Sequence, residues 1–265
     1  MDFICPQEFI DLAHLLADEA QPIARHYFRN EDMQVEIKSA HDPVTIADRE
    51  IEQKWRKIIQ SKRPQDGIWG EEFGRINPDA ELTWIFDPID GTKVFTLGRA
   101  TFGCMIGLHH KQHGFILGLI DQPIVNLRWF GAKGCGATLN GKKLQTKAPA
   151  SAANMRSSVN NLFRLPPALK TLHDELKKEI HFVAAGGDCM NYAGIADGAL
   201  HYYFDCNQQI FDIAAAIPII EEAGGIITNI DGSAIEVKDG DYTVLGACTP
   251  QLHAELLTRY KKIAA

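Results

Sequence analysis

The stretch that decides the fold reads Trp84-Ile85-Phe86-Asp87-Pro88-Ile89-Asp90-Gly91-Thr92-Lys93-Val94-Phe95-Thr96. The β-branched and aromatic residues from 83 to 86 predict a buried strand, and the Asp-Pro and Asp-Gly pairs are turn signals that end it. Asp87 and Asp90 should therefore lie at a strand end, where a chain can offer oxygen ligands to a metal ion and then turn toward a phosphate. Carboxylates without His or Cys nearby favour magnesium, manganese or calcium over zinc.

A second short apolar stretch stops in the same way. Ile68 and Trp69 precede Gly70, and the carboxylates of Glu71 and Glu72 follow directly. The glycine is a turn signal, so this pattern predicts another strand end that presents acidic side chains.

Asp212 begins a run of small residues, Ile213-Ala214-Ala215-Ala216. Small side chains let the start of a helix pack closely against neighbouring backbone, and both the helix dipole and a nearby cation favour a carboxylate there. Taken alone, Asp212 is interpreted as a helix N-cap or a first-turn acid, because such acids are common.

The composition is that of an ordinary globular protein. The 265 residues are 45% apolar and 23% charged, which is enough to bury a full core in one domain or in two closely packed halves. The net charge of −7 comes from acids spread along the chain. No basic cluster follows an aromatic-rich strand, so we expect no nucleic acid as a partner. No apolar run is long enough to cross a bilayer, so we expect no membrane either.

The start of the chain and its cysteines predict a cytoplasmic protein. No cationic region precedes an apolar stretch near Met1, as it would in a signal peptide. The six cysteines show no C-x-x-C pair, which argues against a zinc site or a redox pair. We expect reduced and mostly buried thiols, and a disulfide scaffold is the weaker alternative.

Helical spacing dominates the first sixty residues, and strands follow after residue 100. Residues 7–29 should form an amphipathic helix, and a second helix should begin near Thr45. The polar segment 38–43 between them is expected to be an exposed loop. Alternating patterns broken by turn residues predict strands at 102–108, 115–120 and 127–130.

Beyond residue 150 helical stretches alternate with short strands. Helices are expected at 167–179, 188–197, 211–223 and 249–263. Strands are expected at 182–184, 201–204, 225–230 and 242–245. The whole pattern predicts an α/β fold of stacked helix and sheet layers. Residues 1–145 would form a half that carries the metal-binding motifs, and residues 146–265 a half that completes the site.

Several motifs in chain order resemble the inositol monophosphatase superfamily of metal-dependent phosphatases, over nearly the whole chain. They are Pro43-Val44-Thr45-Ile46-Ala47-Asp48, Gly70-Glu71-Glu72, Asp87-Pro88-Ile89-Asp90-Gly91-Thr92, and Phe211-Asp212-Ile213-Ala214-Ala215 with Glu222-Ala223-Gly224-Gly225. Each motif is weak alone, but the ordered set is specific. The resemblance implies an αβαβα sandwich. One departure is Phe211, where the family usually has Trp or Tyr.

The resemblance also implies a metal centre. Two or three magnesium ions, for which manganese could substitute, would be held by Glu71, Asp87, Asp90, Asp212 and the main-chain carbonyl of Ile89. The charges of the residues agree with this, because clustered carboxylates raise one another's pKa unless cations neutralise them. Amide groups of Gly91 and Thr92 would bind phosphate oxygens at a helix start.

In the mechanism of the resembled family, a metal-activated water attacks phosphorus in line with the leaving oxygen. Glu71 and Thr92 would hold this water, and Asp48 would accept a hydrogen bond from the Thr92 hydroxyl. The residues by themselves leave a second interpretation equally open, in which Thr45 caps the second helix and Asp48 lies in its first turn.

Finer details resemble the histidinol-phosphatase branch, which would place the enzyme in histidine biosynthesis. They are Gly67 to Gly74, Ile120-Asp121-Gln122-Pro123, Arg128-Trp129 and Gly186-Gly187-Asp188-Cys189. Asp188 and Asp205 could bind the cationic end of histidinol phosphate, whereas inositol offers only hydroxyls. Asp188 could equally be a helix N-cap after a Gly-Gly turn.

Alternative substrates stay open because residues 206–210 depart from the histidinol-phosphatase pattern and Asp205 replaces the usual Glu. The alternatives are inositol phosphate, the runner-up, and nucleotide or sugar phosphates. The family resemblance further implies a homodimer. A hypothesis of another class is a metal-binding scaffold without turnover, but every carboxylate that the mechanism needs is present.

Overall fold

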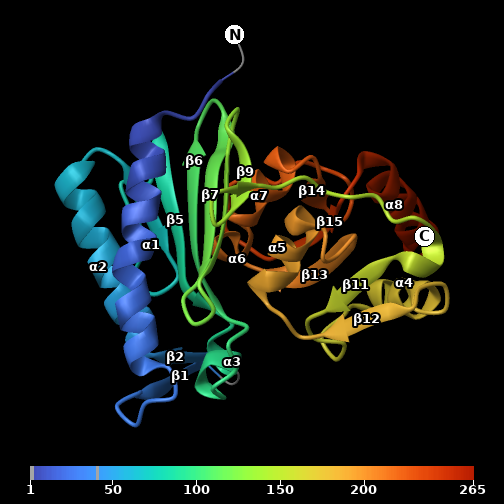
Figure 1. The fold of residues 1–265 in the computed structure, drawn as a ribbon, viewed down its shortest axis with the longest axis horizontal. Coiled ribbons are helices and arrows are strands. Elements are labelled where there is room, and N and C mark those ends of the chain that lie inside the picture. The colour runs from blue at the N-terminus through green and yellow to red at the C-terminus, as the bar shows by residue number, and fades with distance from the viewer. Residues whose placement is uncertain (1–2, 40–41) are drawn as a thin grey trace.

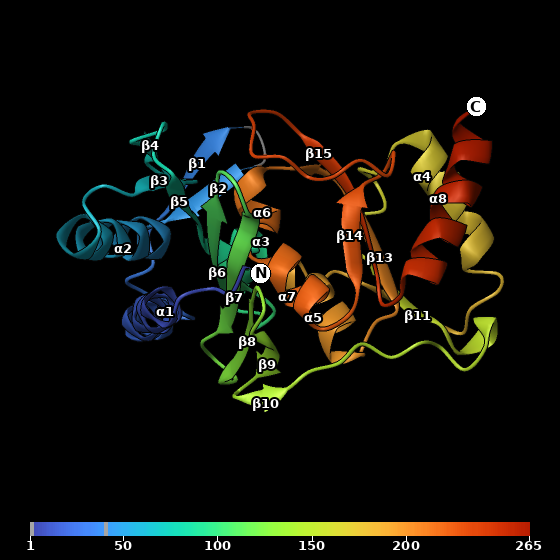
Figure 2. The ribbon, with the colours of Figure 1, turned by 90° about the horizontal axis from the view of Figure 1, so that it is seen from above.

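The computed structural model describes residues 3–39 and 42–265. Within them, an eight-stranded and a five-stranded sheet are stacked between layers of helices. Helices α1 (Gln7–Tyr27) and α2 (Ile46–Lys62) cover the outer face of the larger sheet (Figure 1). Helices α5 (Cys189–Asp197) and α7 (Ala216–Glu222) lie between the sheets, and α4 (Pro167–Leu176) and α8 (Pro250–Ala264) cover the far side (Figure 2). The expected αβαβα sandwich is confirmed.

The larger sheet has the strand order β10-β9-β8-β7-β6-β5-β3-β4. Its strands are β3 (Gly67–Gly70), β4 (Gly74–Ile76), β5 (Leu82–Asp90), β6 (Gly103–His110), β7 (Gly114–Gln122), β8 (Leu127–Ala132), β9 (Gly136–Leu139) and β10 (Lys142–Lys143). Strand β5 runs on to Asp90, so the prediction that the Asp-Pro pair ends it is wrong. Pro88 lacks an N–H, and its effect is a break in the pairing with β6 between Asp87 and Asp90.

The smaller sheet has the order β12-β11-β13-β15-β14. Its strands are β11 (Arg156–Val159), β12 (Phe182–Ala185), β13 (Tyr202–Gln208), β14 (Ile226–Asn229) and β15 (Tyr242–Ala247). The helix expected at 211–223 is instead two helices, α6 (Ile210–Ile213) and α7. Pro218 explains the interruption, because it lacks the N–H that would bond the Ala214 carbonyl four residues earlier.

A short hairpin replaces much of the expected loop at 38–43. Strand β1 (Val35–Ser39) pairs with β2 (Asp42–Thr45), with Val35 opposite Thr45 and Ile37 opposite Pro43. The loop prediction is therefore wrong at both flanks, and its centre, residues 40 and 41, lies outside the described residues. The short helix α3 (Thr92–Thr96) begins after Gly91, where a helix start was expected, whereas the short helix η1 (Ala152–Asn154) was not expected.

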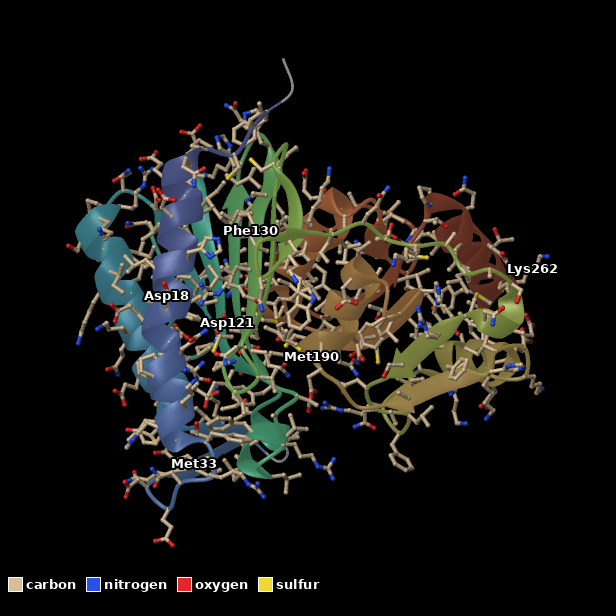
Figure 3. All side chains as sticks on the ribbon, viewed as in Figure 1. Asp18, Met33, Asp121, Phe130, Met190 and Lys262 are labelled. Carbon is tan, nitrogen blue, oxygen red and sulfur yellow. The ribbon has the colours of Figure 1, made fainter. Side chains whose placement is uncertain are left out.

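Close contact between layers positions the central helices. A Cβ atom at Gly118 of β7 would lie 1.9 Å from the Ala215 carbonyl oxygen, and one at Gly107 of β6 would lie 2.8 Å from the Ala214 Cβ. The small residues after Asp212 thus pack on glycines of the sheet, as their sequence predicted. Met190 of α5, labelled in Figure 3, is partly buried and packs against the apolar cluster that includes Met105 and Ile120.

Arg128 is one of the residues that link helix α1 to the sheet. Arg128 of β8 donates to Asp18 of α1 at 2.8 Å and to Asp121 of β7 at 2.6 Å.

In the described part of the chain, no helix has the length and apolar character of a membrane span. The six cysteines are all unbonded thiols, and only Cys135 is exposed.

Candidate active site

Three aspartates from two distant parts of the chain meet between the sheets. Asp87 and Asp90 come from β5, and Asp212 is the third residue of α6. Each offers an oxygen atom, and these atoms all lie within 4.8 Å of one another. Asp87 is only 2% exposed. Oxygen atoms grouped in this way are the ligand set that hard divalent cations prefer.

A main-chain N–H fixes one oxygen of each aspartate. The Ile89 amide donates to Asp87 at 3.0 Å, the Cys189 amide to Asp90 at 2.5 Å, and the Gln209 amide to Asp212 at 2.7 Å. Asp212 is thus a first-turn acid, as interpreted from its sequence, and a member of the cluster as well. Three separate elements hold the carboxylates in place before any ion binds.

Burial and like charges raise the pKa of all three carboxyl groups. Burial is the main cause for Asp87, followed by Glu71 and Asp90. For Asp212 the charges of Asp90 and Glu71 follow burial. Burial and Asp188 raise the pKa of Asp90 to about 7. A divalent cation would favour the ionised forms, so this donor set fits a metal ion.

Glu71 follows the last residue of β3 and borders the cluster. Its amide donates to the Phe86 carbonyl of β5 at 3.2 Å. Lys38 of β1 places its Nζ 3.5 Å from Glu71 and 2.5 Å from Glu72. The ammonium group of Lys38 therefore brings a positive charge from the hairpin to the acidic group.

Thr92 connects the cluster to α2. Its hydroxyl lies 3.3 Å from Asp48 and 3.0 Å from the Ile89 carbonyl oxygen. Asp48 also accepts from the Thr45 amide at 2.9 Å, within a capping box at the start of α2. Both interpretations of Asp48 are thus compatible, because each of its oxygens has a different partner. Burial raises the pKa of Asp48 to about 7.

Gly91 forms the turn between β5 and α3. Its φ of 87° lies in the left-handed region that glycine tolerates. A Cβ at this position would also lie 3.0 Å from Asp188 Oδ2. Only glycine leaves the approach between the turn and Asp188 open.

Asp188 and Asp205 differ in how their oxygens are used. Asp188 is the N-cap residue of α5, but its side chain makes no capping bond. Its buried Oδ2 has no hydrogen-bond partner in the described residues. Its φ of 44° is one that side-chain-bearing residues rarely adopt. Asp205 instead accepts from the Tyr203 hydroxyl and the Cys206 amide.

Sequence reasoning missed two residues near the site. Asn160 follows β11, and its side chain is hydrogen-bonded to both Asp188 and Asp205. These bonds lower the pKa of each carboxyl group, whereas burial raises it. Glu52 of α2 is fully buried and binds the turn that carries Glu71. Glu52 left a signal in its spacing of four residues from both Asp48 and Arg56, which places the three on one side of a helix.

Comparisons with known proteins find relatives along nearly the whole chain. The sequence model of the inositol monophosphatase family matches residues 6–264. The histidinol-phosphatase of Mycobacterium tuberculosis is 33% identical over 254 residues, which are 94% of this chain and 96% of that protein. The chloroplastic bifunctional phosphatase IMPL2 of Arabidopsis thaliana is 36% identical over 84% of this chain and 65% of its own length.

A solved inositol monophosphatase from Zymomonas mobilis has the same fold. It superposes with a TM-score of 0.84 at 34% identity, over 96% of this chain and 98% of the other. The family match spans nearly all of the chain, and the relatives are phosphatases of small esters. The chain therefore belongs to the inositol monophosphatase family of phosphoric monoester hydrolases.

Proposed function

We propose that this protein is a magnesium-dependent phosphomonoesterase whose substrate is histidinol phosphate. The observation that carries the proposal is the meeting of Asp87, Asp90 and Asp212 within 4.8 Å. This acidic group lies beside a glycine turn and a threonine hydroxyl, so a phosphate could bind between a metal ion and amide donors.

The proposed ligands of two or three magnesium ions are Glu71, Asp87, Asp90, Asp212 and the Ile89 carbonyl, and manganese could replace magnesium. Bound ions would neutralise phosphate charge and lower the pKa of an attacking water. The amides of Gly91 and Thr92 would orient the phosphate.

Thr92 and Asp48 would orient the attacking water. The Thr92 hydroxyl has two acceptors within reach, the Asp48 carboxylate and the Ile89 carbonyl. When Thr92 donates to Asp48, its oxygen can accept a hydrogen bond from one O–H of the water, and Glu71 would accept one from the other O–H. The residues thus orient the water toward phosphorus, and positioning supplies much of the rate in phosphoryl transfer.

Asp188 supports histidinol phosphate as the substrate. Its buried Oδ2, which has no hydrogen-bond partner among the described residues, lies beside the Gly91 turn, where the ester's alkyl end would emerge. An ammonium group would satisfy that oxygen, and a buried carboxylate gains more from a cation than from a neutral hydroxyl. The histidinol-phosphatases among the relatives agree with this choice.

Inositol phosphate is the second candidate, and one observation favours it. Asp205, the other proposed substrate contact, already accepts hydrogen bonds on both oxygens. A pocket with one available carboxylate selects less strongly for a cation, which suits a polyol ester. Nucleotide and sugar phosphates are further alternatives. The homodimer, the cytoplasmic location and the division at residue 145 stay predictions.

Phosphate release from a panel of esters tests the proposal. L-histidinol phosphate, myo-inositol 1-phosphate, adenosine 3′,5′-bisphosphate and fructose 1,6-bisphosphate would be compared with magnesium and with a chelator. We expect release only with magnesium, and a kcat/KM for histidinol phosphate about a hundredfold above the others. A preference for another ester would refute the substrate. No release from any ester would favour the scaffold without turnover.

A further inference from the structure

Glu52 is a fully buried carboxylate that binds main-chain amides rather than solvent. Its Oε2 accepts from the Glu72 amide at 2.7 Å, and its Oε1 accepts from the Phe73 amide at 3.2 Å. Arg56, one helical turn later, donates to Oε1 at 2.7 Å. All of these bonds meet at a side chain that is 0% exposed.

The turn that Glu52 holds is the one that carries Glu71. The Glu71 amide is bonded to Phe86 of β5, and the next two amides are bonded to Glu52. Arg56 also donates to the Gly74 carbonyl at the start of β4. The whole connection between β3 and β4 is thus fixed from two sides, by β5 and by α2.

Gly70 shows how closely the carboxylate fits under this turn. A Cβ at residue 70 would lie 1.9 Å from Glu52 Oε1 and 2.3 Å from its carboxyl carbon. The backbone there is not in the left-handed region, so close approach and not backbone conformation requires a glycine. Any side chain at this position would displace Glu52.

A buried carboxylate costs free energy unless its partners compensate for lost hydration. A single ion pair with Arg56 would not require two amides from one turn. The aspartates of the cluster are each oriented by a direct main-chain bond. At Glu71, Lys38 lies 3.5 Å from the carboxylate, and the bonds to the amides of residues 71–73 fix the backbone from which the side chain leaves. The position of the turn therefore sets where the Glu71 carboxylate can reach.

We propose that Glu52 is a positioning residue that holds the 71–73 turn so that Glu71 points its carboxylate at the metal site. The inference rests on the proposed function, because it assigns Glu71 as a ligand. In metal sites, groups that orient a ligand typically contribute tenfold to a hundredfold to metal affinity.

Glu52→Gln tests the role with little change of shape. Its NH₂ group would face an amide or guanidinium donor, so at least one bond to the turn is lost. We expect calorimetric titration of the metal-free protein to show about a tenfold or greater loss of Mg²⁺ affinity. At saturating Mg²⁺, kcat should stay within about threefold of the parent, because Glu71 itself is retained.

Two further variants make the test specific. Gly70→Ala displaces Glu52 from the opposite side and should weaken Mg²⁺ binding in the same way. Asp66→Asn is the matched control, since Asp66 is also buried, precedes β3, and binds Trp84 and Arg63 instead of the turn. It should lower thermal stability and leave Mg²⁺ affinity unchanged.

An unchanged Mg²⁺ affinity in folded Glu52→Gln would overturn the proposal, as would an equal loss in Asp66→Asn. If Glu52→Gln does not fold, Gly70→Ala decides, and failure of both to fold would make Glu52 a folding residue instead. Asp87→Asn separates the two proposals. If Asp87→Asn keeps full Mg²⁺ affinity, the proposed metal site is wrong. If Asp87→Asn loses Mg²⁺ affinity and Glu52→Gln does not, only the positioning role is refuted.

Discussion

Asp87 is the most deeply buried of the three clustered aspartates, and burial is the main reason that its pKa is raised. Asp87→Asn removes one charged ligand and also some repulsion among the carboxylates. We expect a folded protein whose Mg²⁺-dependent phosphate release falls about a thousandfold, since metal stabilisation of roughly 4 kcal/mol is lost. Phosphate release and circular dichroism measure the two effects. Substantial residual activity would refute the metal assignment.

Asp188 carries the substrate prediction, because one of its buried oxygens has no partner in the described residues. Asp188→Asn should raise KM for histidinol phosphate about tenfold to a hundredfold, the usual worth of a hydrogen bond between charged groups. KM for an aryl phosphate without an amine, measured in parallel, should change little. Equal changes for both esters would leave Asp188 without a role in specificity.

At this scale, sequence reasoning identified residues that carry a motif and missed those that support them. Asp87, Asp90 and Asp212 stand in recognisable surroundings, and the structure brings them together. Asn160 has no motif around it, and its place beside Asp188 depends on how two distant loops fold. Asp205 shows the converse, because sequence could not reveal that Tyr203 already occupies one of its oxygens.

At the scale of elements, the close contact between Gly118 of β7 and Ala215, just after α6, helps to position Asp212. Gly118→Ala would put a methyl group 1.9 Å from the Ala215 carbonyl, where backbone meets backbone and cannot yield easily. We expect the free energy of unfolding to fall by about 3 kcal/mol. Mg²⁺ affinity should fall as well, because α6 carries Asp212. Chemical denaturation and calorimetric titration measure the two quantities.

Gly114→Ala is the control on the same strand. In the described residues no atom lies within 4 Å of the Cβ it would add, but its φ of 73° strains an alanine. It should cost about 1 kcal/mol and leave Mg²⁺ binding intact. If both alanine variants lost the same amount of stability, the close packing at Gly118 would not be the cause.

Most elements could be predicted because their apolar pattern extends over many residues, as in α1 and in β6 to β8. The hairpin of β1 and β2 was missed because its segment is polar and short, and tertiary contact decides its pairing. Pro218 could have predicted the break between α6 and α7, but the expectation of one helix at 211–223 did not take it into account. The αβαβα layering itself came from the family resemblance, since strand order depends on long-range contacts.

At the scale of the whole molecule, the buried carboxylates link stability to both pH and metal. The pKa values of Asp48 and Asp90 rise from 3.8 to about 7 on folding, mainly through burial. Between about pH 4 and pH 7 the folded protein therefore binds more protons than the unfolded chain. Without metal, the free energy of unfolding should fall as pH rises through this window. A pKa difference of about three corresponds to about 4 kcal/mol for one such group.

Magnesium should offset part of this loss of stability, because it binds the ionised carboxylates of the folded protein. At a concentration of about a hundred times Kd it would add about 2.7 kcal/mol, or roughly 5–10 °C in Tm. Thermal unfolding from pH 5 to pH 8 at constant ionic strength, with a chelator or with Mg²⁺, measures both effects. The Mg²⁺ shift should grow with pH and be small in Asp87→Asn. A chelated protein that gains stability from pH 5 to pH 7 would show that these carboxylates do not oppose folding, and an equal Mg²⁺ shift in Asp87→Asn would place the ion elsewhere.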